Sequence, residues 1–183
     1  MLGWKECVVS APKRLDVHLR DVIEEDLPTF FADQRDPDAV RMAAFRSRDW
    51  EPFITHWKKI LDDNTCITRT VVLDGRVAGN VVCWGDPAER KVGYWIGRQF
   101  WGKGVATEAL SQFLKLATTR PLYAYVAKHN VASLRVVQKC GFVITGEVEG
   151  PSGGKAEPVR EVILRLDVPA PAQTLKTETS LGA

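Results

Sequence analysis

The segment from Gly93 to Leu110, GYWIGRQFWGKGVATEAL, constrains the fold of this 183-residue chain more than any other. Its first residues have the composition of a strand, and those after Gly104 have the apolar spacing of an amphipathic helix. Glycines at 102 and 104 leave the backbone of the turn unshielded, and the first N–H groups of a helix have no partner within it. Such a turn can bind a phosphate, or it can be no more than a tight connection.

Two nucleotide-binding motifs fail at this turn. Residues 97–103 match the G-x-x-x-x-G-K of a P-loop, but Gly104 follows where a P-loop needs Ser or Thr to hold magnesium. A dinucleotide-binding fingerprint fails because Thr107 replaces its third glycine and no acidic residue ends a second strand after the helix. The sequence therefore predicts neither a P-loop NTPase nor a Rossmann-type enzyme.

Composition limits the class of protein further. Hydrophobic residues make up 45% of the chain, which suffices for the core of one domain, and a net charge of +2 excludes a strongly basic nucleic-acid binder. The four cysteines lie far apart and form no Cys-x-x-Cys pair, so we predict neither a metal site nor a disulfide framework. Because no apolar run reaches the ~18–20 residues of a membrane span, we expect a cytoplasmic protein without a membrane partner.

Apolar periodicity and turn residues divide the chain into strands and helices. Asp49 and Asn130 are candidate N-caps, Gly141 is a candidate helix stop, and Asp74-Gly75 is typical of a type I′ hairpin turn. The expected strands are 15–19, 65–73, 76–84, 91–97, 121–128, 142–149 and 158–166, and the expected helices are 24–34, 50–61, 104–118 and 131–140.

This order predicts the fold class. Three strands follow one another after the second helix, which is more than a doubly wound sheet contains. We therefore expect an α/β (α+β) fold with a mixed, mostly antiparallel central sheet of about seven strands and helices on both faces. Residues 14–167 form the expected domain, and the segments 1–13 and 168–183 are expected to be loosely ordered termini.

Two motifs together carry a family resemblance. The run YWIGRQFWGKGVATEAL and the later run HNVASLRVVQKCGF resemble the acetyl-CoA-binding core of GNAT-superfamily N-acetyltransferases. The opening RLDVHLRDVIEEDLP is typical of the branch that acetylates ribosomal-protein N-termini, such as the ribosomal-protein alanine N-acetyltransferases. The resemblance implies a GNAT-like acyl-CoA N-acyltransferase fold, acetyl-CoA as the cosubstrate and no metal.

The resemblance also implies which residues bind the cosubstrate. The family turn Gln/Arg-x-x-Gly-x-Gly/Ala matches residues 101–106, although Trp101 stands where Gln or Arg is commoner. A second register that starts at Gln99 fits the letters of the motif better. We prefer the first register because it places Val105 and Ala106 on the apolar stripe of the helix. The implied acetyl-CoA-binding residues are Tyr94, Trp95, Ile96, Trp101, Gly102, Lys103, Gly104, Val105, Ala106, Thr107 and Asn130.

The implied reaction moves an acetyl group directly from the thioester to a primary amine, with no covalent enzyme intermediate. The backbone N–H of Ile96 corresponds to the family's oxyanion donor. Ser133 corresponds to a serine suggested to protonate the departing thiolate in the ribosomal branch. The tyrosine that many other members use corresponds to Val137, so a water molecule is the alternative proton donor.

The general base is the least determined residue. Lys91 occupies the position of a glutamate found in many relatives, which leaves Glu89, Asp86 or Glu149, acting directly or through water. We take Glu89 as the first candidate. An N-terminal α-amine, with a pKa of ~7.7–8.0, needs no strong base.

The acceptor groove is expected at residues 36–50 and in the loop 150–157. Asp36 and Asp38 there could meet a cationic amine, but an Asp-Pro-Asp run is better explained as a helix-capping turn. Apolar residues of the same segment that could form a pocket wall or belong to the core are Met42, Phe45 and Trp50.

The charge pattern agrees with a bound phosphate. Between Arg98 and Thr145 there are seven basic residues and one acidic residue, which creates a local positive field. The expected partners are acyl-CoA and an amine acceptor, which could be a protein N-terminus, and a homodimer remains open. Because Lys91 and Val137 replace two family residues, the alternative function is a catalytically silent acyl-CoA-binding sensor or scaffold.

Overall fold

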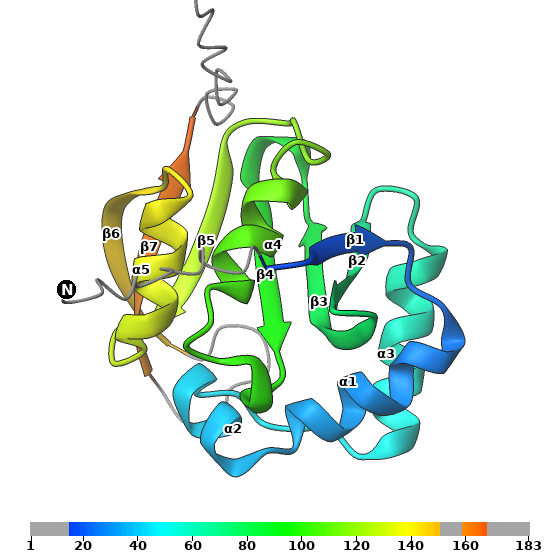
Figure 1. The fold of residues 1–183 in the computed structure, drawn as a ribbon. Coiled ribbons are helices and arrows are strands. Elements are labelled where there is room, and N and C mark those ends of the chain that lie inside the picture. Colours follow the sequence, from blue (N-terminus) through cyan, green and yellow to red (C-terminus); the bar gives the residue numbers. More distant parts are fainter. Residues whose placement is uncertain (1–14, 151–158, 168–183) are drawn as a thin grey trace, which may run out of the picture.

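The computed structural model describes residues 15–150 and 159–167, and a seven-stranded sheet forms its centre (Figure 1). The strand order is β1-β2-β3-β4-β5-β7-β6. Neighbouring strands are antiparallel except for β4 and β5, which are parallel. The strands are β1 (Val17–Arg20), β2 (Ile67–Leu73), β3 (Arg76–Trp84), β4 (Arg90–Ile96), β5 (Leu122–Ala127), β6 (Val143–Gly150) and β7 (Val159–Leu166). The mixed, mostly antiparallel sheet predicted from the sequence is confirmed.

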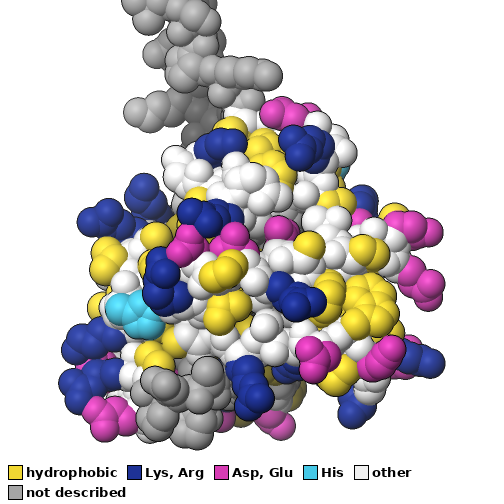
Figure 2. All heavy atoms as spheres, turned by 90° about the horizontal axis from the view of Figure 1, so that it is seen from below, with side chains coloured by type: hydrophobic (Ala, Val, Ile, Leu, Met, Phe, Trp, Pro, Cys, Tyr) yellow, Lys and Arg dark blue, Asp and Glu magenta, His cyan; other side chains and the backbone are white. Residues whose placement is uncertain are grey.

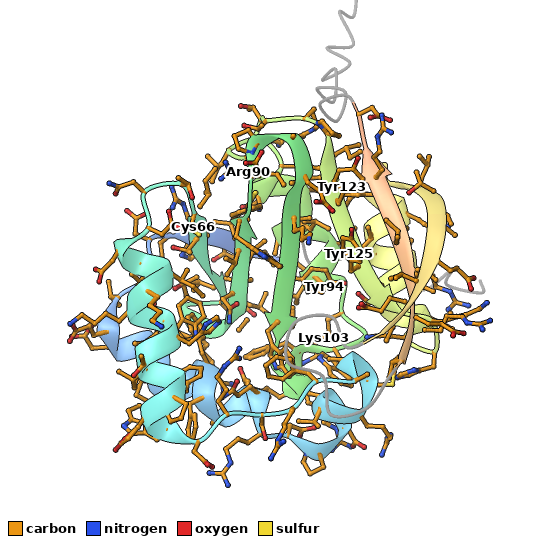
Figure 3. All side chains as sticks on the ribbon, turned by 180° about the vertical axis from the view of Figure 1, so that it is seen from behind. Cys66, Arg90, Tyr94, Lys103, Tyr123 and Tyr125 are labelled. Atoms are coloured by element: carbon orange, nitrogen blue, oxygen red, sulfur yellow. The ribbon has the colours of Figure 1, made fainter. Side chains whose placement is uncertain are left out.

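Helices cover both faces of this sheet (Figures 1 and 3). They are α1 (Leu27–Gln34), α2 (Pro37–Ala43), α3 (Trp50–Asp62), α4 (Val105–Phe113) and α5 (Val131–Lys139), with 3-10 turns at Glu24–Asp26, Pro87–Glu89 and Arg98–Phe100. Val105, Leu110 and Phe113 of α4 belong to the main core cluster. On the opposite face, Phe53 and Trp57 of α3 join a smaller cluster with α1.

A β-bulge interrupts the alternation of β3 side chains between the two clusters. The register with β2 shifts between Val71 and Val72, which leaves Ala78 as the extra residue of β3. Val77 and Val82 pack on the smaller cluster, while Ala78, Val81 and Cys83 belong to the main core. Gly79 is needed here because a Cβ at this position would overlap the carbonyl oxygen of Trp95 on β4.

Local turn and cap predictions are largely confirmed. Asp74 and Gly75 both have positive φ angles of 48° and 75°, as a type I′ turn requires, and Gly141 ends α5 with φ 93°. Asn130 is the N-cap of α5, and its side chain accepts a hydrogen bond from the N–H of Ser133 at 3.0 Å. Asp49 occupies the N-cap of α3 but makes no side-chain cap bond.

The sequence did not predict α2, and it made α4 too long. The Asp-Pro-Asp run is a capping turn as expected, with the Asp36 side chain accepting from the N–H groups of Asp38 and Ala39. The helix that it caps has seven residues and buries only Ala39, which is too little apolar periodicity to detect. Helix α4 ends at Phe113 rather than at residue 118.

Other predictions concern the termini, the thiols and the membrane. The termini 1–13 and 168–183 and most of the loop 150–157 lie outside the described residues. Cys66, Cys83 and Cys140 are free thiols. Within residues 15–150 and 159–167, none of the helices combines the length and the apolarity needed to cross a membrane.

Asp26 ties the first strand to α1 and β2. Its carboxylate, 1% exposed, pairs with Arg20 at 2.6 Å and accepts hydrogen bonds from the Thr70 hydroxyl at 2.6 Å and the Ile23 N–H at 3.1 Å. Burial alone would raise the pKa of Asp26, but the hydrogen bonds from Arg20, Thr70 and Ile23 outweigh it and lower that pKa. The ionised form is therefore the one that stabilises the fold.

We expect Asp26→Asn to lower the free energy of unfolding at pH 7 by about 3 kcal/mol, because it leaves Arg20 without its partner. A lowered folded-state pKa gives stability that is present above the unfolded pKa and lost as pH falls through the folded pKa. Urea unfolding at pH 7 and pH 3 should thus show the difference from wild type shrinking at acid pH. Asp21→Asn, at an exposed pair with Arg69, serves as the control and should change little. An equal loss at both pH values would contradict this account.

Candidate active site

Strands β4 and β5 pair at their first residues and then part. Their parallel ladder joins Arg90 with Leu122 and Lys91 with Tyr123, and no further pairing between these two strands occurs in the described part of the chain. On its outer side β4 stays paired with β3 as far as Ile96, and β5 stays paired with β7 as far as Ala127. The inner edges of the two strands therefore face a gap.

Backbone groups of β4 point into this gap. Gly97 N–H donates to the Ala78 carbonyl at 2.9 Å, which makes Ile96 and Gly79 a pair that is not hydrogen-bonded in the antiparallel ladder. By the same alternation, the N–H groups of Tyr94 and Ile96 face away from β3 and toward β5. The Ile96 carbonyl accepts from the Trp101 indole N–H at 2.7 Å, while the Ile96 N–H is directed into the gap.

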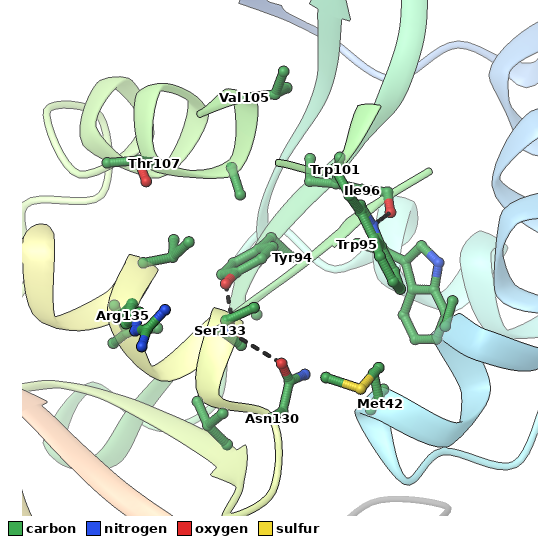
Figure 4. A pocket seen from close by; sticks show the side chains of 18 of the residues that line it. Met42, Tyr94, Trp95, Ile96, Trp101, Val105, Thr107, Asn130, Ser133 and Arg135 are labelled. Carbon is green, nitrogen blue, oxygen red and sulfur yellow. Dashed lines mark hydrogen bonds between the residues drawn. The ribbon is translucent and has the colours of Figure 1, made fainter. Parts of the chain in front are cut away.

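A cleft of about 820 Å³ opens over this gap, between β4, β5, α2, the start of α4 and α5 (Figure 4). Ser133 and all predicted cofactor residues except Lys103 line it: Tyr94, Trp95, Ile96, Trp101, Gly102, Gly104, Val105, Ala106, Thr107 and Asn130. The Lys103 ammonium instead donates to the Gln99 carbonyl at 2.9 Å. The Lys103 side chain therefore folds back over residues 99–103 and does not enter the cleft.

The glycine turn has the geometry of an anion site. Gly102 and Gly104 have φ angles of 72° and 84°, which favour glycine, and the N-cap Gly104 provides no side chain to cap the first N–H groups of α4. The helix begins at Val105, in line with the preferred register. Arg135 and Lys139 line the cleft from α5, so positive charge faces the turn.

Helix α2 spans the open end of the gap. Arg98, just after β4, pairs with Asp38 at 2.6 Å and with Asp36 at 3.7 Å. His129, just after β5, places its Nε2 2.9 Å from the Arg41 carbonyl oxygen. Basic and acidic side chains are intermixed over the face that carries α1 and α2 (Figure 2), so its charges largely offset one another.

Ser133 and Tyr94 form a hydroxyl pair in the cleft. The two oxygens lie 2.8 Å apart, and the dashed line in Figure 4 marks this contact. Burial raises the pKa of Tyr94 to about 12, against the opposing effect of the Ser133 hydrogen bond, so the phenol stays protonated. Sequence reasoning gave Tyr94 a backbone role only, because the orientation of a strand side chain toward a distant helix has no local signal.

The candidate bases lie away from the cleft. Glu89 lines neither this cleft nor the pocket described below, and its carboxylate accepts from the Tyr125 hydroxyl at 3.3 Å. Asp86 caps the 3-10 turn before β4 through the Ala88 N–H, and Glu149 pairs with Arg160. The role of Glu89 as the general base stays a prediction. Tyr125, which lines both cavities, connects its carboxylate to the gap.

A second pocket of about 1060 Å³ lies between β3, β4, the α2–α3 connection and α3. It shares Ala43, Val92, Gly93, Tyr94, Trp95 and Tyr125 with the cleft, so the two cavities meet mainly along β4. Tyr94 and Tyr125 both lie in this central region (Figure 3). We call it the aromatic pocket because much of its wall is aromatic: Phe30, Phe45, Phe53, Trp57, Trp84, Tyr94, Trp95 and Tyr125.

Several residues of the second pocket had not been singled out from the sequence. Glu161 is buried, lines the pocket and stands in the apolar strand β7, where an acidic residue among Val and Ile was a usable signal. Phe45 had been named as a wall or core residue, and it lines the pocket while packing edge-on against Trp95 at 5.7 Å. Trp50 instead packs on Phe31 and Phe53.

Comparison with protein-family models shows which family this chain belongs to. The model of the acetyltransferase (GNAT) domain matches residues 16–143. This chain belongs to the GNAT acetyltransferase family. No sequence among the curated proteins matches it.

Solved structures of several acetyltransferases share this fold. The ribosomal L7/L12 α-N-protein acetyltransferase RimL, in complex with coenzyme A, has a TM-score of 0.72 at 15% identity, with 84% of this chain and 95% of that chain covered. Spermidine N-acetyltransferase from Vibrio cholerae, with CoA and spermine, has a TM-score of 0.67 at 18% identity, covering 81% and 95%. An N-acetyltransferase from Staphylococcus aureus Mu50 has a TM-score of 0.69 at 20% identity, covering 83% and 98%.

Asp33 packs directly on the residue that follows β4. A Cβ at Gly97 would lie 2.7 Å from one Asp33 carboxylate oxygen and 2.8 Å from the other. The Asp33 Oδ2 is buried with no hydrogen-bond partner in the described structure. Burial raises the pKa of Asp33 to about 6, the Gln99 hydrogen bond opposes this, and the Asp36 charge adds to it.

Because the folded-state pKa of Asp33 is raised, its contribution to stability is present below the unfolded pKa and lost as pH rises through about 6. An asparagine at this position carries no titratable charge, so the variant should not lose this stability. We therefore expect the free energy of unfolding of Asp33→Asn, relative to wild type, to increase by about 1–2 kcal/mol between pH 4.5 and pH 7.5. Melting temperatures of both proteins across this range check the prediction, with Asp21→Asn as the exposed control. A difference from wild type that does not change with pH would contradict it.

Proposed function

We propose that this protein transfers an acetyl group from acetyl-CoA to a primary amine. The observation that carries the proposal is the parting of β4 and β5, which directs the Ile96 N–H into a gap where two cavities meet. A donor can approach this N–H from the cleft and an acceptor from the aromatic pocket. Such a junction permits direct transfer between two bound substrates.

The cleft fits the donor. The uncapped first turn of α4 and the cations Arg135 and Lys139 suit the pyrophosphate and the 3′-phosphate of CoA. The backbone groups of Tyr94 and Ile96 that face the gap can hydrogen-bond the pantetheine amides. Asn130 uses its Oδ1 as the cap of α5, which leaves its amide N–H₂ for the cosubstrate.

The chemistry then requires three events. The neutral amine nitrogen forms a bond to the thioester carbonyl carbon, and the Ile96 N–H stabilises the oxyanion that develops on the carbonyl oxygen. The C–S bond breaks as the carbonyl re-forms, and the thiolate takes a proton from Ser133. Ser133 regains a proton from water through the hydroxyl of Tyr94, with which it is paired. The amine proton leaves through Tyr125 to Glu89, or to water.

The acceptor is a protein N-terminus or a small-molecule amine. The names of two structural neighbours refer to amines, one a ribosomal-protein N-terminus and the other spermidine, and these names support an amine acceptor here. The motifs favour the ribosomal-protein branch. We further propose that the enzyme is cytoplasmic and uses no metal.

Thiol release tests the activity. Purified protein with acetyl-CoA and a panel of α-amines, polyamines and N-terminal peptides should release free CoA and give acceptors that gain one acetyl group by mass spectrometry. Acetyl-CoA that raises the melting temperature without any turnover would instead support the silent sensor or scaffold. Absence of both effects would overturn the proposed function.

Two hydroxyl variants test the proton donor. We expect Ser133→Ala to lower kcat about 100-fold with little change in the KM for acetyl-CoA, and Tyr94→Phe to lower kcat about 10-fold. Tyr123→Phe is the matched control, because Tyr123 lies on β5 but lines neither cavity. Wild-type kcat in Ser133→Ala would exclude the serine and leave water as the donor.

A further inference from the structure

Arg48 is a cationic residue of the aromatic pocket. It lies between α2 and α3, is half-buried and lines the pocket. No ion pair of Arg48 occurs within residues 15–150 and 159–167. By contrast, Arg41 and Arg98 nearby are both paired with Asp38. Arg48 thus lines the pocket without an ion pair to any carboxylate of the described residues.

Aromatic contacts place Arg48 close to the reacting strand. Its Cζ lies over the Phe45 ring, 5.2 Å from the centroid, and that ring packs edge-on against Trp95 at 5.7 Å. Trp95 directly precedes Ile96, whose N–H is the proposed oxyanion donor. One aromatic ring thus separates the guanidinium from the strand at which the two cavities meet.

Arg48 is partly shielded from solvent and has other basic side chains around it. His56 and Lys59 of α3 line the same pocket. Burial and the charges of Arg48 and Lys59 lower the pKa of His56, and burial lowers the pKa of Arg48 itself. A half-buried cation without a counter-ion is costly, and an anion brought by a ligand would offset that cost.

Two acidic residues also line the pocket. Asp63, at the end of α3, accepts hydrogen bonds from Thr65 and Cys66. Glu161 lines the pocket from β7. The pocket thus combines aromatic walls, a cationic side at Arg48 and Lys59, and a carboxylate on the sheet.

We propose that the amine acceptor of this enzyme carries a carboxylate group that Arg48 binds. The inference rests on the proposed function and narrows its substrate class. The aromatic walls receive the apolar part of the acceptor, and the planar guanidinium can hold a carboxylate through two parallel N–H donors. The carboxylate comes either from the α-carboxyl group of an amino acid or from an acidic side chain near a peptide N-terminus.

Matched acceptors test this inference. One arm compares phenylalanine with phenylalaninamide, and the other compares Ala-Asp-Ala-amide with Ala-Asn-Ala-amide, each with acetyl-CoA. The kcat/KM values are measured for wild type, Arg48→Gln, Arg48→Lys and Arg46→Gln. Arg46 is exposed, lies two residues away and lines neither cavity, so it is the matched control.

We expect Arg48→Gln to reduce kcat/KM for the carboxylate acceptor of one arm at least about 10-fold more than for its amide. Comparing the same pair across variants cancels the different basicity of the two amines. Arg48→Lys should retain part of the preference, and Arg46→Gln all of it. The arm that responds identifies the source of the carboxylate.

Two outcomes overturn the inference, and they are distinguishable. In the first outcome, amines are acetylated but Arg48→Gln changes kcat/KM equally for the carboxylate acceptor and its amide. This result would exclude binding of a carboxylate by Arg48 and would leave the proposed acetyltransferase activity standing. Absence of CoA release with every amine would contradict the proposed function, and the inference would fall with it. Circular dichroism of each variant shows whether it folds, and Arg48→Lys keeps the test decisive if Arg48→Gln does not.

Discussion

The parting of β4 and β5 is the constraint on which the rest of this structure depends. Each strand satisfies its outer backbone groups, β4 with β3 and β5 with β7, while the ladder between them ends at Lys91 and Tyr123. At the first residue of β4, the buried Arg90 guanidinium donates to the Thr65 carbonyl and the Cys83 thiol, which anchors the start of the strand. Polar backbone groups in an unpaired edge need partners, and here a bound cosubstrate can supply them.

Three other elements keep the gap open in one shape. Helix α4 packs its apolar stripe on the sheet and brings the uncapped glycine turn to the gap. Helix α5 presents Ser133 to Tyr94 across it. Helix α2 is held by Arg98 after β4 and by His129 after β5, so it bridges the two strands where they are farthest from their shared ladder.

The sequence predicted what local rules control. The glycine turn, the Asn130 cap, the type I′ turn and the mixed sheet depend on neighbouring residues and on periodicity, and all are present. The β3 bulge, α2 and the Tyr94–Ser133 pair depend on contacts between distant segments, which leave no periodic signal. Arg48 and Glu161 were likewise not predicted, because they become neighbours of one pocket only when separate elements of the fold come together.

Titration of labelled protein with acetyl-CoA, followed by amide NMR, tests the account most directly. The N–H signals of Tyr94 and Ile96 and those of the first turn of α4, residues 105–107, should shift most. The β1 and β6 amides, which lie away from the gap, should not. Large shifts elsewhere with Ile96 unaffected would contradict the claim that the unpaired edge of β4 receives the thioester.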